Sequence, residues 1–215
     1  MQIFKIDQSN PDPAVVAEIA ELLKTGSVIA FPTDTFYGLG ADIYNDNAVK
    51  RVFDLKGRMY NKPILILISD KKELPALISP ESMSVFACQL IDKFWPGPLT
   101  IIFYSARVIP PILTGHTGKI GIRLPNHTFS RRLVEKLGGP LTATSANISG
   151  MPGLNNPSDV LSAIGDRIDA LIDGGMAAGG DASTVVDVTG VVPVIIREGV
   201  IPPSDIRETL GLPAK

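Results

Sequence analysis

The sequence has few of the residues from which disulfide bonds and metal centres are built. It contains one cysteine, Cys88, and two histidines, His116 and His127. A single cysteine excludes an internal disulfide bond. One cysteine and two histidines argue against a Cys/His zinc site and against a histidine-based metal centre. The G-x-S-x-G segment that presents the nucleophile of many hydrolases is also missing, so any chemistry has to come from other residues.

A strong charge of one sign and a long apolar run are missing as well. The 20 Lys and Arg residues nearly balance the 22 Asp and Glu residues, and the formal net charge is −2. The surface as a whole is therefore not attractive to nucleic acid. No apolar run is long enough for a membrane helix, and no basic and apolar leader opens the sequence. We expect a cytoplasmic protein with no membrane partner, and a hydrophobic content of 45% predicts a folded core.

Helical and strand-like apolar patterns alternate along the chain. Helices are predicted from Asp12 to Gly26 and from Asp46 to Gly57, each between a capping residue and a terminating glycine. Further helices are predicted at 71–77, 80–94, 128–137, 158–164 and 204–210, strands at 27–31, 64–68, 99–104, 119–124, 141–144, 170–172, 184–188 and 194–197, and loops at 33–40 and 174–180. This interleaving predicts one α/β domain over residues 1–215, with a core at about 12–200 and the strands in a single mixed sheet.

The first polar cluster, Lys56, Arg58 and Lys62, follows the second of these helices. Cations at a helix end can simply favour the helix dipole and stay solvated, which is our interpretation of Lys50 and Arg51. The other three come after the helix has ended and before a buried strand, where α/β sheets place ligands. They therefore indicate an anion site.

The second polar cluster, Ser145-Ala146-Asn147, follows another predicted strand. A turn built from turn-forming residues is one interpretation. A serine hydroxyl and an asparagine amide can also donate hydrogen bonds to phosphate oxygens. If the fold brings the two clusters together, fixed cations and neutral donors form the kind of site that a nucleoside triphosphate needs.

Four further residues lie at strand ends, and the residues alone leave two interpretations open for each. Arg123 and Arg197 end predicted strands, where an arginine can form an ion pair at the sheet edge or bind a carboxylate with two parallel hydrogen bonds. Ser183 opens a β-branched strand segment, and Lys119 can be a plain surface lysine.

Taken in order, these segments resemble the Sua5/YrdC/YciO family. The segments that carry the resemblance are Pro32–Gly40, Lys56-x-Arg58, Trp95–Thr100, Ile122–Pro125, Ser145–Asn147, Ser183–Asp187 and Arg197-x-Gly199. Each is only suggestive by itself, but their ordered combination over most of the chain is specific. The resemblance implies an open, twisted α/β sheet with flanking helices and a large, positively charged cavity. It also implies the short, single-domain form, without the C-terminal domain of longer members.

The family activity implied is that of a threonylcarbamoyl-AMP synthase. L-threonine, bicarbonate and ATP would give threonylcarbamoyl-adenylate and pyrophosphate, for modification of adenosine 37 in tRNA. Mg²⁺ would accompany ATP, with no metal ligand from protein side chains. The implied partner is a downstream threonylcarbamoyl transferase complex, and tRNA or double-stranded RNA is a further candidate partner. Two routes stay open here: direct contact with tRNA, or diffusion of the adenylate to the downstream transferase.

The resemblance also implies residue roles. The family's catalytic tetrad around the ATP phosphates would be Lys56, Arg58, Ser145 and Asn147. The remaining contacts to ATP would come from Lys62, Lys119 and Arg197. The threonine site would be lined by Thr35, Arg123, the backbone of Ala143, and Ser183.

Three other functions stay open at this point. The basic stretch around Arg58 would also suit a non-catalytic module that binds double-stranded RNA or nucleotides, although the net charge argues against it. A carbamoyl-adenylate enzyme like the related domain of hydrogenase-maturation proteins would need zinc-finger and acylphosphatase-like segments, which are missing. The YciO subgroup is disfavoured because Ser145-Ala146-Asn147 is intact.

Overall fold

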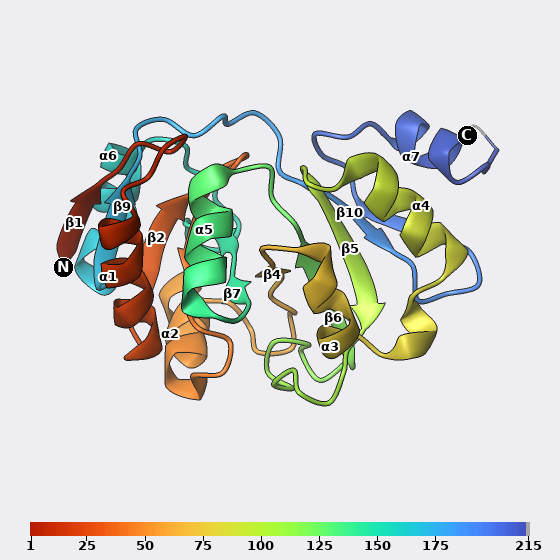
Figure 1. Cartoon of the computed structure of the whole chain (residues 1–215), viewed down its shortest axis with the longest axis horizontal. Helices are drawn as coiled ribbons and strands as arrows, with labels where there is room; N and C mark the ends of the chain where they lie inside the picture. Colours follow the sequence, from red (N-terminus) through yellow and green to blue (C-terminus); the bar gives the residue numbers. More distant parts are fainter. Residues whose placement is uncertain (214–215) are drawn as a thin grey trace.

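The strands of this chain are divided between two mixed sheets. The computed structural model describes residues 1–213. The strands within these residues are β1 (Gln2–Lys5), β2 (Ile29–Pro32), β3 (Tyr37–Gly40), β4 (Ile66–Leu67), β5 (Leu99–Tyr104), β6 (Lys119–Arg123), β7 (Leu141–Thr142), β8 (Thr144–Ser145), β9 (Ala170–Asp173), β10 (Thr184–Asp187) and β11 (Val194–Arg197). One sheet has the order β1-β9-β2-β3-β8, and the other has the order β11-β10-β5-β6-β4-β7. Figure 1 shows the two sheets side by side along the long axis of the molecule.

The helices cover these sheets from several sides. They are α1 (Pro13–Lys24), α2 (Asp46–Lys56), α3 (Leu74–Leu77), α4 (Val85–Phe94), α5 (Thr128–Leu137), α6 (Pro157–Ile164) and α7 (Pro203–Thr209), with short 3-10 turns at Lys71–Glu73, Pro80–Ser82 and Gly165–Arg167. None of the helices within residues 1–213 combines the length and the apolar character needed to cross a membrane. The α/β fold class is confirmed.

The single sheet that the sequence predicted is corrected to two. In particular, the segments on both sides of the loop at 174–180 do not share a sheet. β9 pairs in parallel with β1 and β2, whereas β10 pairs in parallel with β5. An apolar run shows that a strand is buried, but it does not show which strand lies beside it, so the sequence could not separate these two sets.

Three helix starts and one predicted loop also differ from expectation. Asn45 caps α2 and Asn156 caps α6, in place of Asp46 and Ser158. The last helix begins at Pro203 without a side-chain cap, in place of one at Ser204. Part of the predicted loop at 33–40 is strand β3, which pairs antiparallel with β2.

Each face of the five-stranded sheet is covered by a different pair of helices. Ile29 and Phe31 of β2 are buried in a cluster with apolar residues of α1 and α5, whereas Val28 and Ala30 belong to the main core with residues of α2 and α6. This alternation is the two-residue period of a strand that is buried on both faces. Figure 1 shows α1 and α5 over these strands, and α3 and α4 over the six-stranded sheet.

The six-stranded sheet packs only one of its faces into the core along β5. Leu99, Ile101 and Phe103 are buried in the main core, which also holds apolar residues of α4. The alternate residues Thr100 and Ile102 line a cavity. One face of this sheet is therefore free to build a site.

The segment from β7 to β8 passes from one sheet to the other. β7 pairs with β4 in the six-stranded sheet, and β8 pairs with β3 in the five-stranded sheet. Ala143 lies between the two strands and its backbone N–H donates to the carbonyl oxygen of Leu65 at 3.1 Å. The chain therefore crosses between the sheets at the point where the second polar cluster begins.

Candidate active site

A cavity of about 780 Å³ is lined by residues of both sheets. Its floor includes Thr100 and Gly121 of the six-stranded sheet, and its other walls come from the loop after β2, the end of α2 and the segment after β8. The sequence-predicted site residues among those lining the cavity are Thr35, Lys56, Arg58, Lys62, Arg123, Ala143, Ser145, Asn147, Ser183 and Arg197. The fold thus brings both polar clusters and the strand-end arginines into one space of ligand size.

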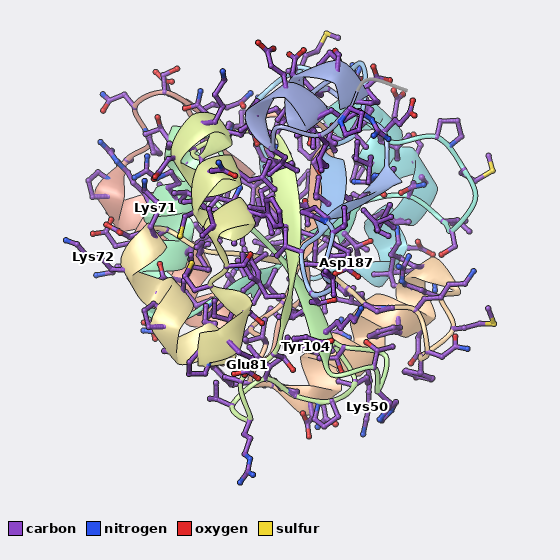
Figure 2. All side chains as sticks on the ribbon, turned by 90° about the vertical axis from the view of Figure 1, so that its right-hand side faces the viewer. Lys50, Lys71, Lys72, Glu81, Tyr104 and Asp187 are labelled. Atoms are coloured by element: carbon purple, nitrogen blue, oxygen red, sulfur yellow. The ribbon has the colours of Figure 1, made fainter. Side chains whose placement is uncertain are left out.

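Lys119 is the one predicted site residue that does not line this cavity. It lies on the same face of β6 as Gly121 and Arg123, because side chains alternate along a strand. Its Nζ lies 3.0 Å from Oδ2 of Asp187 and 5.7 Å from the ring centroid of Tyr104. Figure 2 shows Tyr104 and Asp187 on the neighbouring strands β5 and β10. A contact of Lys119 with ATP stays a prediction.

Lys56 is the last residue of α2, and it reaches the segment after β8. The helix ends because Gly57 takes a left-handed conformation with φ of 59°, which costs glycine little. The Lys56 ammonium donates to the backbone oxygens of Ser145 and Asn147 and to Oδ1 of Asn147. Burial, with a smaller contribution from the charge of Arg58, lowers the pKa of Lys56 to about 8.

Arg58 is aimed by the turn that follows α2. Its Nε donates to the carbonyl oxygen of Lys62 at 3.1 Å, and its Nη2 donates to that of Pro63 at 2.8 Å. Neither partner is charged, and Arg58 forms no ion pair within residues 1–213. Burial lowers the pKa of its guanidinium, so an anion in the cavity would relieve an uncompensated charge.

Arg123 has a different environment, because a carboxylate neutralises it. Its Nη2 lies 2.5 Å from Oδ1 of Asp34, its Nε donates to the carbonyl oxygen of Gly97, and its Nη1 donates to Oγ1 of Thr35 at 3.3 Å. The second oxygen of Asp34 accepts from the backbone N–H of Asn126 at 3.0 Å. The guanidinium is therefore held in one orientation by three partners.

Arg197 is held against Ser183 at the end of β11. Its Nε and Nη2 both donate to the carbonyl oxygen of Ser183, and Nη2 also donates to the Ser183 hydroxyl at 3.0 Å. That hydroxyl lies 2.9 Å from Oγ1 of Thr100. Burial, then the charges of Arg123 and Arg58, lower the pKa of Arg197. Arg123 and Arg58 are therefore close enough to Arg197 to repel its charge.

The sequence missed two polar residues of the site. Asp34 lies in the polar loop, but its role depends on Arg123, which is far away in the chain. Tyr37 lines the cavity, and its hydroxyl donates to the carbonyl oxygen of Gly175 at 2.7 Å. Burial raises the pKa of Tyr37 to about 12, so the hydroxyl keeps its proton. The position of Tyr37 between two polar segments was the feature of the sequence that could have identified it as a site residue. Because residues 33–40 were assigned to a loop, this feature was not used.

The site offers cations and neutral donors, but no ligand set for a metal. None of the described lining residues of the cavity is Asp or Glu. Residues 1–213 also contain no group of three or more His, Cys, Asp or Glu side chains placed to hold an ion. The donor set therefore suits an anionic ligand with polar groups of its own.

The fold and the cavity place this chain in the class of α/β proteins that have an arginine- and lysine-lined cavity between two mixed sheets. The chain belongs to the Sua5/YciO/YrdC family, because the family model Sua5_yciO_yrdC, described as telomere recombination, matches residues 21–199. The family resemblance of the sequence segments is thereby confirmed.

Relatives with assigned names agree with this membership. A protein from Pyrococcus abyssi, named threonylcarbamoyl-AMP synthase, is 38% identical over 194 residues, which are 89% of this chain and 56% of the relative. A protein of the same name from Bacillus subtilis is 34% identical over 206 residues, which are 95% of this chain and 59% of the relative. The chain thus spans between half and two thirds of the length of these relatives.

Solved structures share the fold closely. The crystal structure of P. abyssi Sua5 complexed with L-threonine matches with a TM-score of 0.93 and 34% identity, over 98% of this chain and 61% of that one. The crystal structure of Escherichia coli YciO matches with a TM-score of 0.86 and 29% identity, over 93% of this chain and 96% of that one. The two subgroups therefore share one architecture, and the choice between them depends on the site.

Proposed function

We propose that this chain is a nucleotidyltransferase that makes threonylcarbamoyl-adenylate from L-threonine, bicarbonate and ATP. The observation that carries the proposal is the presence of two different cationic centres in one cavity. Arg123 is neutralised by Asp34 and flanked by the hydroxyl of Thr35, whereas Arg58 and Arg197 have no carboxylate partner within residues 1–213. The names of the P. abyssi and B. subtilis relatives, and the threonine bound in the P. abyssi structure, support it.

The triphosphate would occupy the half of the cavity with unneutralised cations. Arg58, Arg197 and Lys62 line the cavity and can donate charge-assisted hydrogen bonds to phosphate oxygens. The hydroxyl of Ser145 makes no hydrogen bond to any group within residues 1–213, so it is free to donate to a ligand. This arrangement is expected for a ligand with several negative charges.

The amino acid would occupy the half around Arg123. Three of the five guanidinium N–H groups are used by protein acceptors, and the remaining two can hold a carboxylate. The hydroxyls of Thr35 and Ser183 and the backbone at Ala143 line the same cavity. They offer hydrogen bonds to a substrate hydroxyl, which a site can use to reject an analogue that lacks it.

The reaction needs positioning more than it needs a protein nucleophile. The threonine amine would attack bicarbonate, giving a carbamate and water, or carbon dioxide, giving a carbamate and a proton that is released to solvent. A carbamate oxygen would then form a bond to the α-phosphorus of ATP while the bond to the pyrophosphate oxygen breaks. Negative charge grows on the leaving pyrophosphate, where Arg58 would stabilise it. Holding carbamate and phosphate in line supplies much of the rate.

Mg²⁺ would arrive with ATP as part of the substrate. Because the lining residues within 1–213 include no carboxylate, the ion would be held by phosphate oxygens and water, a set that Mg²⁺ commonly uses. It would neutralise part of the phosphate charge. A cytoplasmic location, a downstream transferase complex and service to tRNA position 37 belong to the same proposal.

The test is pyrophosphate release from ATP and bicarbonate with each common amino acid in turn. We expect release that depends on threonine and bicarbonate, and that falls about 10²–10³-fold in Arg58→Ala, as on loss of other oxyanion donors. Lys50→Ala is the matched control, because Lys50 is an exposed lysine of α2 outside the cavity lining.

Two outcomes would contradict the proposal. One is that the folded protein binds ATP but releases no pyrophosphate with any amino acid. This result would favour a YciO-like protein that lacks the synthase activity. The other is tight RNA binding with a steep salt dependence and no ATP turnover, which would favour the non-catalytic RNA-binding module.

A further inference from the structure

The Lys56 ammonium has no donor left for a ligand. Only 2% of Lys56 is exposed, and its Nζ lies 2.5 Å from the Ser145 oxygen, 2.8 Å from the Asn147 oxygen and 3.2 Å from Asn147 Oδ1. A lysine ammonium has three N–H groups, and the segment 145–147 takes all three. A phosphate oxygen could bind this ammonium only by displacing one of these protein acceptors.

Asn147 is equally committed to the protein. Its Oδ1 accepts from Lys56, and its Nδ2 donates to the carbonyl oxygen of Ile148 at 3.1 Å and to that of Met151. Only 6% of Asn147 is exposed. Both amide N–H groups therefore close the loop on itself, and the side chain has no N–H to offer a ligand.

Arg58 and Ser145 differ from these two residues in having free donors. Arg58 gives two of its five N–H groups to the backbone of Lys62 and Pro63. The Ser145 hydroxyl bonds to no group within residues 1–213, and both residues line the cavity. The four residues of the tetrad thus fall into two pairs with opposite hydrogen-bond states.

We propose that Lys56 and Asn147 form a latch that positions the ligand-binding pair Arg58 and Ser145, and do not themselves contact the phosphates. The proposal deepens the proposed function and rests on it only for the identity of the anion as a nucleoside triphosphate. Lys56 and Asn147 are positioning residues in this assignment, and the residues in contact with substrate are Arg58 and Ser145.

The backbone around Lys56 shows how the latch sets both ligand groups. The carbonyl oxygen of Lys56 accepts from the N–H of Ser149 at 3.0 Å, so side chain and backbone together join the end of α2 to the segment after β8. On the other side, the N–H of Arg58 donates to the carbonyl oxygen of Phe53 at 2.9 Å across the turn at Gly57. Lys56 therefore ties the end of α2 to the loop that carries Ser145, and the hydrogen bond between Arg58 and Phe53 places Arg58 directly after that end.

Two measurements separate a latch from a direct ligand. The first is amide hydrogen exchange of residues 145–151 in the ligand-free protein, and the second is the Kd for inorganic tripolyphosphate. We expect Lys56→Met and Asn147→Ala each to accelerate exchange and to weaken binding about tenfold, as on loss of a charge-assisted hydrogen bond. The double variant should lose no more than the weaker-binding single variant, because both changes open the same latch. Arg58→Met should weaken binding at least as much without accelerating exchange.

A conservative variant tests the role of the charge. Lys56→Gln keeps two N–H donors and loses the charge, so a latch predicts tighter tripolyphosphate binding than Lys56→Met shows. A direct phosphate ligand can also be replaced in part by the Gln amide, but it predicts that neither variant accelerates the exchange of residues 145–151. Lys50→Met is the control, because Lys50 lies on the same helix at the periphery of the molecule, as Figure 2 shows, and it should change neither measurement.

Three results would overturn the assignment. They are unchanged exchange in Lys56→Met despite weaker binding, multiplied effects in the double variant, and equal binding by the Gln and Met variants. If Lys56→Met does not fold, Asn147→Ala still decides between the two roles, because a latch predicts both faster exchange of residues 145–151 and weaker tripolyphosphate binding in this variant. Tripolyphosphate binding without threonine-dependent pyrophosphate release would refute the proposed function and leave the latch intact. No tripolyphosphate binding by the unmodified protein would refute the ligand role of Arg58 and Ser145.

Discussion

Arg123 and Asp34 form a buried ion pair in which Nη2 lies 2.5 Å from Oδ1, with 5% and 13% of the two side chains exposed. The other Asp34 oxygen accepts from the N–H of Asn126. One carboxylate therefore ties the loop after β2 to the chain that follows β6. It also neutralises Arg123, whereas Arg58 and Arg197 have no carboxylate partner among residues 1–213.

Removing this carboxylate should destabilise the fold strongly. We expect Asp34→Ala to lower the free energy of unfolding by about 3 kcal/mol or more, because it leaves Arg123 buried without its counter-charge. Urea unfolding measures this. Glu21→Ala is the contrasting control, because the Lys24–Glu21 pair is 44% and 66% exposed and should contribute less than about 1 kcal/mol. Equal losses in the two variants would contradict the structural role of Asp34.

The free energy of unfolding below pH 6.5 should depend on the protonation of His127. Burial is the main cause that lowers its pKa to about 4, with Asp34 opposing and Arg123 reinforcing the shift. Its Nδ1 accepts from the N–H of Ser130, and its Nε2 lies 2.6 Å from Oε1 of Gln8. Protonation of Nδ1 would remove the hydrogen bond that caps α5, so the folded protein resists it.

The sign of the pH effect follows from the lowered pKa. Between pH 6.5 and 4 the unfolded chain takes up a proton at this histidine that the folded protein refuses, so stability falls as pH falls, by at most about 3 kcal/mol. His127→Gln should flatten this part of the profile in thermal unfolding. His116→Asn is the control, because His116 is exposed. An unchanged slope in His127→Gln would contradict the assignment.

The sequence predicts a helix or strand well where the residues of that segment alone determine its type and its ends. The strands at 99–104 and 194–197 and the helix at 128–137 have the predicted bounds. For these elements, the spacing of apolar residues and the residues that end the element all lie within the segment itself. Strand β3 was missed because Gly38 and Gly40 suggested a turn. A Cβ on Gly40 would lie 2.9 Å from Cε1 of Phe31, so glycine is present there for the ring of the neighbouring strand.

The residues of the site also differ in how far they could be predicted from local sequence. The clusters that begin at Lys56 and Ser145 could be predicted, because each is a short run of polar residues at an element end. The role of Asp34 depends on a partner in another strand, and Lys119 turns to Asp187 instead of lining the cavity. Hydrogen-bond partners are a property of the assembled sheets, so the sequence could not separate residues that hold the site from residues that face a ligand.

Anion binding should weaken on the alkaline side because of Lys56. Its pKa is lowered from 10.5 to about 8, by burial and by Arg58, so above pH 8 the free protein loses this charge and one latch hydrogen bond. Arg123, Arg197 and Lys62 also line the cavity, and the arginines keep their charge. We expect the tripolyphosphate affinity to fall between pH 7 and 9 in calorimetric titrations. The fall should be smaller in Lys56→Met, and an equal fall in that variant would contradict the prediction.

The close approach of Gly199 to the segment 182–183 should control the orientation of Arg197. A Cβ at position 199 would lie 2.1 Å from the carbonyl oxygen of Ala182 and 2.7 Å from the carbonyl carbon of Ser183, the residue that holds Arg197. Gly199→Ala must therefore shift this backbone, and we expect a loss of about 1–3 kcal/mol in the free energy of unfolding and a several-fold higher KM for ATP. Gly190→Ala is the matched control, since its nearest contact would be an ordinary 3.5 Å, and it should stay within about 0.5 kcal/mol. Unfolding curves and ATP kinetics that match those of the unmodified protein in Gly199→Ala would show that the Ser183–Arg197 contact does not depend on this close approach.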